Sequence, residues 1–236
     1  MTDLSNWTHY KNIEGDLQGE YEWVRANLVY TPYISPDGQV FCMSFNRDIK
    51  YHIFQDENEK WTEELLENRF RKELEFHDKA SKTLPTLDVL DVDYQNRKIF
   101  LKWHGDDFYM QGLKSGGYEN VLPDWKDQWI NLIKGMWDLG IYKISLHPNS
   151  WVVRDGLLVP FNWFFCYNKT DPSITVRSLL IQISSDRQEK LSGVDIDKLY
   201  TPVEAQYIAF NSFKSNYPAD LIENILTAYR NRNYND

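Results

Sequence analysis

The polar residues with the clearest chemical potential lie in residues 140–163, GIYKISLHPNSWVVRDGLLVPFNW. Ser145 and Ser150 are five positions apart on either side of His147, and Asn162 follows the second apolar run. Hydroxyl and amide oxygens are neutral, so they offset little of the cost of removing water from Mg²⁺, and we expect weak metal binding. His147 is a candidate proton acceptor, because an unperturbed histidine titrates near pH ~6.5. The segment therefore offers polar ligands but neither a carboxylate base nor a carboxylate metal ligand in these positions.

Apolar spacing predicts the elements that position these residues. One helix begins after Asp124, a candidate N-cap, and ends near residue 139, with one face made of Trp125, Trp129, Leu132, Ile133 and Met136. Two short strands follow at residues 151–153 and 157–161, and a turn at residues 154–156 joins them. We therefore expect the polar loop to lie between a buried helix and a hairpin.

The first half of the chain is expected to be strands around one helix. A turn at residues 35–38, Ser-Pro-Asp-Gly, joins strands at 28–34 and 40–45, and a third strand is expected at 49–54. Thr62 is a candidate N-cap for a helix running to about residue 82, in which Leu66, Phe70 and Leu74 share a face. Strands at 87–94 and 98–103 complete this half.

The polar loop and its hairpin resemble the catalytic and metal-binding segment of the protein kinase-like superfamily, which includes small-molecule phosphotransferases. Residues 140–142 and 146–148 and the Asp155-Gly156 turn carry the resemblance, and the element order of the first half is that of the small lobe. The resemblance implies an α+β, two-lobed fold: a small lobe of about five antiparallel strands plus one helix, and a larger, mainly helical lobe. It places the small lobe at residues 1–105, the hinge and linker at 106–123 and the large lobe at 124–236.

The resemblance also assigns roles that these residues do not fill. Kinase-like enzymes use an Asp base, an Asn metal ligand and a second metal-binding Asp, and these positions fall on Ser145, Ser150 and Asn162. A one-residue shift to Asn149 would restore a single ligand but no base. In the family the His-Pro pair shapes the loop, which favours that role for His147 over proton transfer. The sequence therefore predicts an inactive, pseudokinase-like module with no metal site.

Nucleotide-binding positions are also sparse. The hairpin turn has only Gly38, whereas a kinase covers the phosphates with several glycines. Kinase-like enzymes carry a lysine on the third strand, and Lys50 or alternatively His52 is the candidate for it here. The candidate for its acidic partner on the following helix is Glu73 or alternatively Glu75. Gly105 would lie in the hinge that reads the adenine ring. We expect no required cofactor, with ATP binding possible but weak.

The acidic residues near that hinge have a simpler explanation than metal binding. Asp106 and Asp107, next to His104, are expected in a surface loop, because adjacent residues of a strand face opposite ways. Residues 111–123 are expected to form a flexible crossing between the lobes. The histidine spacing indicates no zinc site.

Composition limits the class of partner. Lys and Arg number 26 against 35 Asp and Glu, a formal net charge of −9, which argues against nucleic acid as a partner. No apolar run reaches the about 18 to 20 residues of a membrane helix, and no secretory signal is recognisable. Cys42 and Cys166 stand in apolar surroundings, as reduced thiols of a cytoplasmic protein do, although one disulfide between them stays open.

Two functions fit these observations. The first is a non-catalytic kinase-like module that binds a protein partner or ligand. The second is an atypical phosphotransferase or nucleotidyltransferase that uses relocated residues such as Asp155, Asn149 or Glu73. We favour the first, because three positions are substituted together. A third possibility is an α+β protein whose likeness to kinases is accidental.

Overall fold

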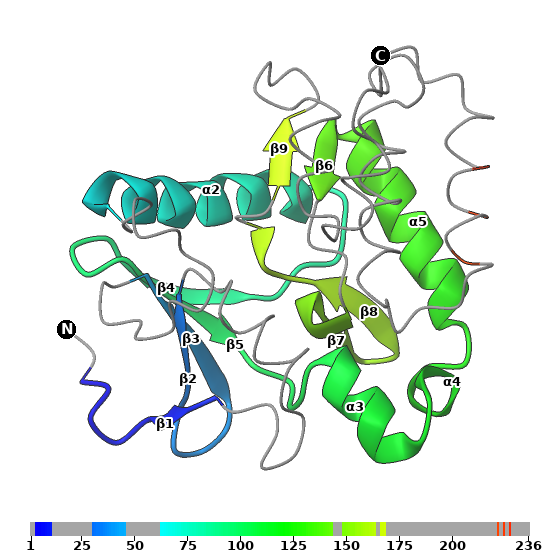
Figure 1. Ribbon diagram of the computed structural model, residues 1–236, viewed down its shortest axis with the longest axis horizontal. Coiled ribbons are helices and arrows are strands. Elements are labelled where there is room, and N and C mark those ends of the chain that lie inside the picture. Colours follow the sequence, from blue (N-terminus) through cyan, green and yellow to red (C-terminus); the bar gives the residue numbers. More distant parts are fainter. Residues whose placement is uncertain are drawn as a thin grey trace, which may run out of the picture.

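A computed structural model describes residues 3–10, 30–45, 62–143, 148–163 and 166–168, and residues 221, 224 and 227 singly. The strands of the first half form one sheet, and the long helix α2 (Glu63–Ser81) lies along it (Figure 1). The helices α3 (Phe108–Ser115), α4 (Tyr118–Val121) and α5 (Trp125–Asp138) lie beside it with two smaller, two-stranded sheets. The predicted strand at 49–54 and most of the helices predicted beyond residue 168 lie outside the described residues.

The small-lobe sheet has five antiparallel strands in the order β1-β2-β3-β5-β4. They are β1 (Thr8–His9), β2 (Thr31–Ile34), β3 (Val40–Ser44), β4 (Val89–Asp93) and β5 (Lys98–Lys102). The predicted hairpin at 28–45 and the strands within 87–103 are confirmed. The sequence analysis missed β1, which is two residues long and is defined by its pairing with β2.

The turn between β2 and β3 is closed by its own polar groups. The backbone N–H of Gly38 donates to the carbonyl of Ser35 at 2.9 Å, and the Ser35 hydroxyl donates to the Asp37 carboxylate at 2.5 Å. Gly38 has φ of +72°, in the left-handed region that glycine tolerates best. These contacts explain why Ser-Pro-Asp-Gly forms a turn here.

The helix α2 (Glu63–Ser81) confirms the predicted cap and length. The Thr62 side chain accepts a hydrogen bond from the backbone N–H of Leu65 at 3.1 Å, and Lys82 ends the helix. Its buried face serves two cores: Phe70 packs with the sheet, whereas Phe76 packs among the helices of the large lobe. This helix therefore belongs structurally to both lobes.

Beyond the sheet, the described residues form three α-helices, one 3₁₀ turn and four short strands. The elements are α3 (Phe108–Ser115), α4 (Tyr118–Val121), α5 (Trp125–Asp138), β6 (Ile141–Lys143), the 3₁₀ turn η1 (Pro148–Ser150), β7 (Trp151–Arg154), β8 (Leu157–Pro160) and β9 (Cys166–Asn168). The strand β7 pairs with β8, and β6 pairs with β9, both antiparallel. The predicted helix after Asp124 and the predicted hairpin are both confirmed, although the Asp124 side chain does not cap the helix.

The expected flexible crossing at residues 111–123 is wrong, because this stretch contains most of α3 and all of α4. Its glycines have specific structural roles. Gly112 lies inside α3 where a Cβ would be 2.5 Å from the ring of Tyr118, and Gly116 ends the helix with φ of +76°. Close packing and a left-handed cap account for the glycines that the sequence analysis took for a flexible segment.

Two apolar cores fill the described part of the chain. The first lies among α3, α5 and the hairpin and contains five buried tryptophans, Trp125, Trp129, Trp137, Trp151 and Trp163. The second begins under the sheet and extends to Val152, Val159 and Phe161 of the hairpin. The second core is therefore shared between the lobes.

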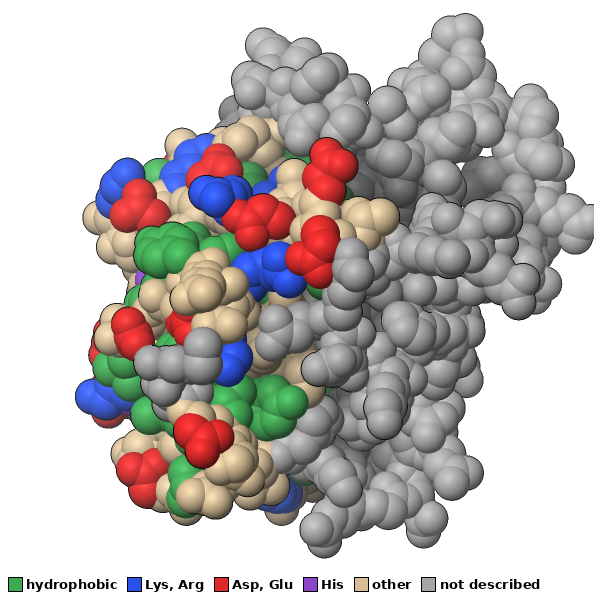
Figure 2. All heavy atoms as spheres, turned by 90° about the vertical axis from the view of Figure 1, so that its left-hand side faces the viewer, with side chains coloured by type: hydrophobic (Ala, Val, Ile, Leu, Met, Phe, Trp, Pro, Cys, Tyr) green, Lys and Arg blue, Asp and Glu red, His purple; other side chains and the backbone are tan. Residues whose placement is uncertain are grey.

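The described surface mixes both signs of charge with apolar groups on the face seen in Figure 2. On α2, Arg71 pairs with Glu67 at 2.6 Å and Lys82 with Asp78 at 3.2 Å, each one helical turn apart. Among the described residues, no helix is long and apolar enough to cross a bilayer.

Candidate functional site

Asn162, which the resemblance aligns with a metal-binding Asp, has its side chain turned to protein groups. It has φ of +61°, a conformation that Asn tolerates better than most residues, and it is 3% exposed. Its Oδ1 accepts a 2.6 Å hydrogen bond from the hydroxyl of Tyr30, and its Nδ2 lies 3.4 Å from the hydroxyl of Ser150. The amide oxygen that would face a metal is thus already bonded within the protein.

Of the other two predicted catalytic positions, Ser150 and Ser145, the structure describes only Ser150. Ser150 is fully buried at the end of η1, and its backbone carbonyl accepts a 2.9 Å hydrogen bond from the N–H of Phe161. The structure brings Ser150 and Asn162 together, as the resemblance implies. Ser145 and His147 lie outside the described residues. Asn149 is also buried, at 8% exposure.

Lys143 is a buried cation in this site that the sequence analysis missed. Its Nζ donates to the carbonyls of Phe161 and Asn162 at 2.6 and 2.8 Å, and it lies 5.3 Å from the ring centroid of Trp163. Burial lowers the pKa of this amine, and interaction with Cys166 and Glu73 acts in the opposite direction. The signal in the sequence is a lysine directly after Ile141 and Tyr142, inside an apolar run.

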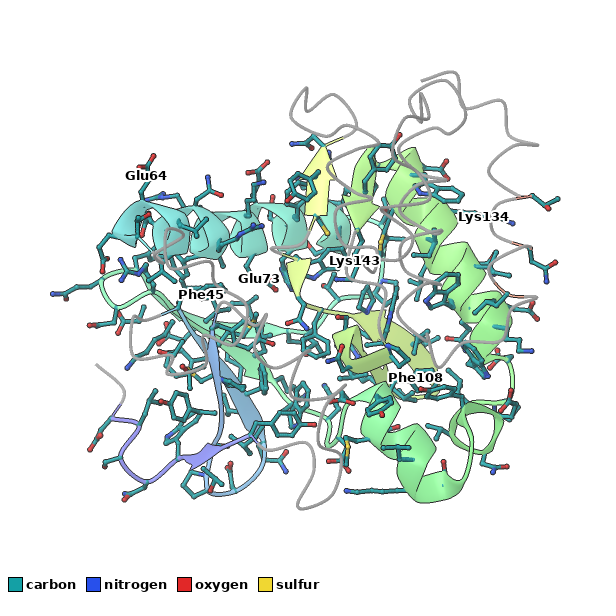
Figure 3. The ribbon with its side chains drawn as sticks, in the orientation of Figure 1. Phe45, Glu64, Glu73, Phe108, Lys134 and Lys143 are labelled. Atoms are coloured by element: carbon teal, nitrogen blue, oxygen red, sulfur yellow. The ribbon has the colours of Figure 1, made fainter. Side chains whose placement is uncertain are left out.

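Glu73 is buried as well, on the side of α2 that is turned to the interior. It is 2% exposed, and its charge acts to raise the pKa of Lys143. Figure 3 places both residues in the interior between α2 and the large lobe, whereas Glu64 and Lys134 lie on the outside. Two more contacts tie α2 to β9: Lys79 donates to Asn168 at 2.8 Å, and Lys72 lies 4.2 Å from the ring centroid of Tyr167.

The proposed partner of Glu73, Lys50, lies outside the described residues, so that pair stays a prediction. The strand that lies between β2 and β5 is β3, and it carries no lysine. Its residues Phe41 and Met43, which alternate along the strand, both enter the shared core. The face of β3 that enters the shared core is therefore apolar.

Aromatic rings fill the space between β3, the linker and the hairpin. Phe41 stacks on Trp103 with ring centroids 4.5 Å apart, and Phe161 meets both rings edge-on at 6.0 and 5.7 Å. All three side chains are buried. They come from β3, from the residue after β5 and from the residue after β8. This stack is the part of the shared core that joins the two lobes.

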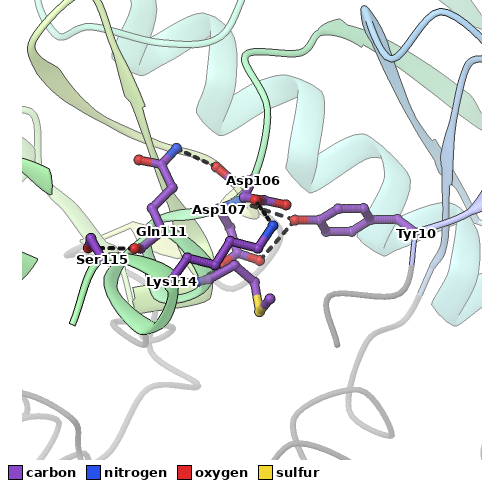
Figure 4. A network of polar contacts seen from close by, with 7 residues as sticks. Tyr10, Asp106, Asp107, Gln111, Lys114 and Ser115 are labelled. Atoms are coloured by element: carbon purple, nitrogen blue, oxygen red, sulfur yellow. Dashed lines mark hydrogen bonds and ion pairs between the residues drawn. The ribbon is translucent and has the colours of Figure 1, made fainter. Parts of the chain in front are cut away.

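The linker also holds a buried carboxyl group, which corrects the expected surface loop. Asp107 is fully buried and caps α3, with one carboxylate oxygen accepting from the N–H of Met110 at 2.9 Å. The hydroxyl of Tyr10 lies 3.3 Å from the other oxygen and 3.2 Å from the Asp107 backbone nitrogen (Figure 4). Of the two neighbouring acidic residues, Asp106 is the one that is partly exposed, and it pairs with Lys114.

Asp107 is the most strongly perturbed carboxyl group of this region. Burial raises its pKa to about 7, although the hydrogen bonds from Met110 and Tyr10 act against the shift. Two residues before Asp107, Gly105 has φ of +103° and bends the linker in a conformation that favours glycine. Nothing in the structure tests Gly105 as a nucleotide contact.

The described residues contain no group of three or more His, Cys, Asp or Glu side chains placed to hold a metal ion. Cys42 and Cys166 are both buried free thiols, and burial raises the pKa of each to about 12. Neither thiol is therefore prepared for nucleophilic chemistry.

Comparison with known proteins gives structural likeness without sequence likeness. No protein-family model and no curated protein matches the chain. Solved structures that resemble it include WbdD, a bifunctional kinase-methyltransferase, at a TM-score of 0.47 and 12% identity over 94% of this chain and 51% of that one. A monomeric WbdD crystal structure gives a TM-score of 0.48 at 11% identity, with 88% of this chain and 49% of that chain covered. The chain thus spans about half the length of these proteins.

The fold itself follows from the arrangement described above. A five-stranded antiparallel sheet with one long helix, a linker, a buried helix and a polar loop with its hairpin occur in the expected order. The residues at two expected catalytic positions, Ser150 and Asn162, are adjacent at the lobe boundary. The chain therefore has an α+β fold whose described elements follow the order that the resemblance to the protein kinase-like superfamily implies.

Proposed function

We propose that this chain is a kinase-like module that does not transfer phosphoryl groups and acts by binding a protein partner. The observation that carries the proposal is the aromatic stack of Phe41, Trp103 and Phe161, which makes the space between the lobes part of one apolar core. A nucleotide base would have to displace these buried rings. The apolar area that they bury would then be lost to water.

The polar residues at the lobe boundary support the same proposal. Phosphoryl transfer needs Mg²⁺ held by hard, charged oxygen ligands against the phosphates. The Asn162 amide is neutral and bonded to Tyr30, and the nearby cation Lys143 is bonded to two backbone carbonyls. Glu73 is also buried, and its charge acts to raise the pKa of that lysine. The described residues therefore do not fit a magnesium–ATP complex.

The two cysteines support placing the module in a reducing compartment such as the cytoplasm. Both are buried as free thiols, Cys42 on β3 and Cys166 on β9. Free buried thiols are usual where disulfides do not form.

A thermal-shift titration of the purified chain with ATP, GTP and ADP, each with and without Mg²⁺, tests the proposal. A ligand at 100 times its Kd stabilises a folded protein by about 2.7 kcal/mol, which is easily detected. We expect no Mg²⁺-dependent increase in Tm. An active kinase titrated with the same stocks is the control. A Mg²⁺-dependent increase that is accompanied by ATP turnover would overturn the proposal.

A further inference from the structure

The Asp107 carboxyl group and its backbone N–H form a fixed polar site at the junction of the lobes. Asp107 bridges to Val152 of β7 and caps α3 through Met110, so its position is set by the fold. The carboxyl group is fully buried, and a buried polar group is costly unless it is hydrogen-bonded. One carboxylate oxygen and the N–H both point to the hydroxyl of Tyr10.

Two aromatic rings form the apolar side of the same site. The ring of Tyr10 meets Phe41 edge-on at 5.7 Å and Trp103 edge-on at 5.6 Å. Both rings are buried and are held against each other by stacking. The Tyr10 ring thus lies against two fixed rings, with its hydroxyl at a fixed carboxyl group.

Among the residues that the structure describes, the segment 3–10, which carries Tyr10, makes fewer contacts than the core beneath it. β1 pairs with β2 over two residues only, and the Tyr10 N–H donates to the Pro32 carbonyl at 2.9 Å. Trp7 adds one edge-on contact with Phe100 at 5.8 Å. Four of the residues before Tyr10 are exposed, namely Asp3, Ser5, Asn6 and Thr8. Such a short, exposed segment opens more readily than the core beneath it.

We propose that Asp107, Phe41 and Trp103 form a binding site for an aromatic ring that carries a hydroxyl group, and that Tyr10 occupies this site as an internal ligand. The chemistry of the ligand follows from the groups present. A hydroxyl both donates and accepts hydrogen bonds, which matches a carboxylate oxygen and an N–H at one position. A free ligand competes with the N-terminal segment, which releases when the site is filled from outside. This site does not depend on whether the chain transfers phosphoryl groups.

The ligand is tested with p-cresol, which has the structure of the tyrosine side chain, on wild type and Tyr10→Ala. Removing the ring opens the site, as deletion of a large side chain leaves a space that small aromatic molecules can fill. We expect p-cresol at about ten times its Kd to raise the Tm of Tyr10→Ala by about 3 to 6 °C. Toluene, which has the ring without the hydroxyl, should raise it much less. Wild type should require a higher p-cresol concentration for the same shift.

Equal shifts with toluene and p-cresol would overturn the proposal, because the site would then be an apolar space without recognition of the hydroxyl. Equal p-cresol affinity in wild type and Tyr10→Ala would overturn the competition with Tyr10. The Mg²⁺–nucleotide titration above is independent of both results, so failure of one proposal is distinguishable from failure of the other.

A second variant, Tyr10→Phe, keeps the ring in the site and removes only the hydroxyl. It tests whether the contact of this hydroxyl with Asp107 holds the segment 3–10 in place. Loss of the hydroxyl should speed hydrogen exchange of the Tyr10 backbone amide about tenfold, because one buried hydrogen-bond pair no longer holds the segment. The Val40 amide, bonded to the Ser35 hydroxyl in the same sheet, serves as the internal control. Unchanged exchange at residue 10 would mean that the hydroxyl does not hold the segment closed.

Discussion

The hydroxyl of Tyr30 donates a 2.6 Å hydrogen bond to Oδ1 of Asn162, so the residue before β2 is bonded to the segment that follows β8. Both side chains are buried, at 3% exposure each. The bond links the first half of the chain to the residue that the resemblance aligns with a metal-binding Asp. This hydrogen bond gives the neutral side chain of Asn162 a structural role.

Tyr30→Phe should lower the free energy of unfolding by about 1 to 3 kcal/mol, because the buried amide oxygen loses its donor while the ring is retained. Chemical denaturation at constant pH measures this. Tyr94→Phe is the matched control. Tyr94 is 67% exposed, so loss of its hydroxyl should leave the free energy of unfolding almost unchanged. Equal stabilities of the two variants would mean that the Tyr30 bond contributes nothing.

Glu73 and Lys143 should be energetically coupled. Lys143→Met removes a buried amine that donates to two backbone carbonyls, and it should lower the free energy of unfolding by about 1 to 3 kcal/mol. The double variant Glu73→Gln/Lys143→Met should lose less stability than the sum of the single variants, by about 0.5 to 3 kcal/mol. Glu64→Gln and Lys134→Met, at residues that Figure 3 places on the outside, form the control cycle. Strict additivity in the first cycle would show that the two charges do not interact.

The raised pKa of Asp107 predicts a pH dependence of stability. An unfolded chain releases this proton near pH 3.8, whereas the folded chain holds it until about pH 7. Between these values the folded state binds more protons, so this group makes the free energy of unfolding fall as the pH rises. Asp107→Asn should remove that dependence, and it should be the more stable protein at pH 8 by roughly 2 to 4 kcal/mol.

Urea denaturation of wild type and Asp107→Asn at pH 5 and pH 8 measures this difference. Other groups titrate in the same window, and comparing the two proteins cancels their contributions. Asp127→Asn is the control, because Asp127 is an exposed carboxylate on α5. A wild-type protein that gains stability relative to Asp107→Asn from pH 5 to pH 8 would contradict the expected sign.

Gln128 should be required for the position of the β7–β8 turn. Its Nε2 donates to the carbonyl of Gly156 at 3.0 Å, and its Oε1 accepts from the N–H of Leu158 at 2.8 Å. Gln128→Ala removes both bonds and should cost about 1 to 3 kcal/mol. Asn131→Ala, an exposed amide on the same helix, is the control. Nuclear magnetic resonance shifts confined to residues 154–158 would confirm the local origin of the loss.

Sequence reasoning succeeded where the determining contacts are local. The Thr62 cap, the Ser35-to-Gly38 turn and the apolar face of α5 each depend on residues within one or two turns of one another. The segment at 111–123 was misread because glycines usually indicate flexibility, whereas here Gly112 makes room for Tyr118.

The polar contacts at the lobe boundary could not be predicted in the same way. Tyr10 and Asp107 are 97 positions apart, and Tyr30 and Asn162 are 132 apart. A sequence shows that these residues can form hydrogen bonds but not which partner the fold will bring near. The predicted roles of Ser150 and Asn162 came from the resemblance, and their contact depends on the hairpin that local patterning did predict.

The shared core has a consequence for the order in which this protein can fold during synthesis. Phe41, Met43 and Phe45 lie early in the chain, yet the core that buries them also needs Val152, Val159 and Phe161. A nascent chain that has emerged only to residue 105 therefore exposes the apolar face of its sheet, as would a fragment with the same end. Such a face is a binding surface for chaperones and a risk for aggregation. The first half must wait for the hairpin to leave the ribosome before its interior is closed.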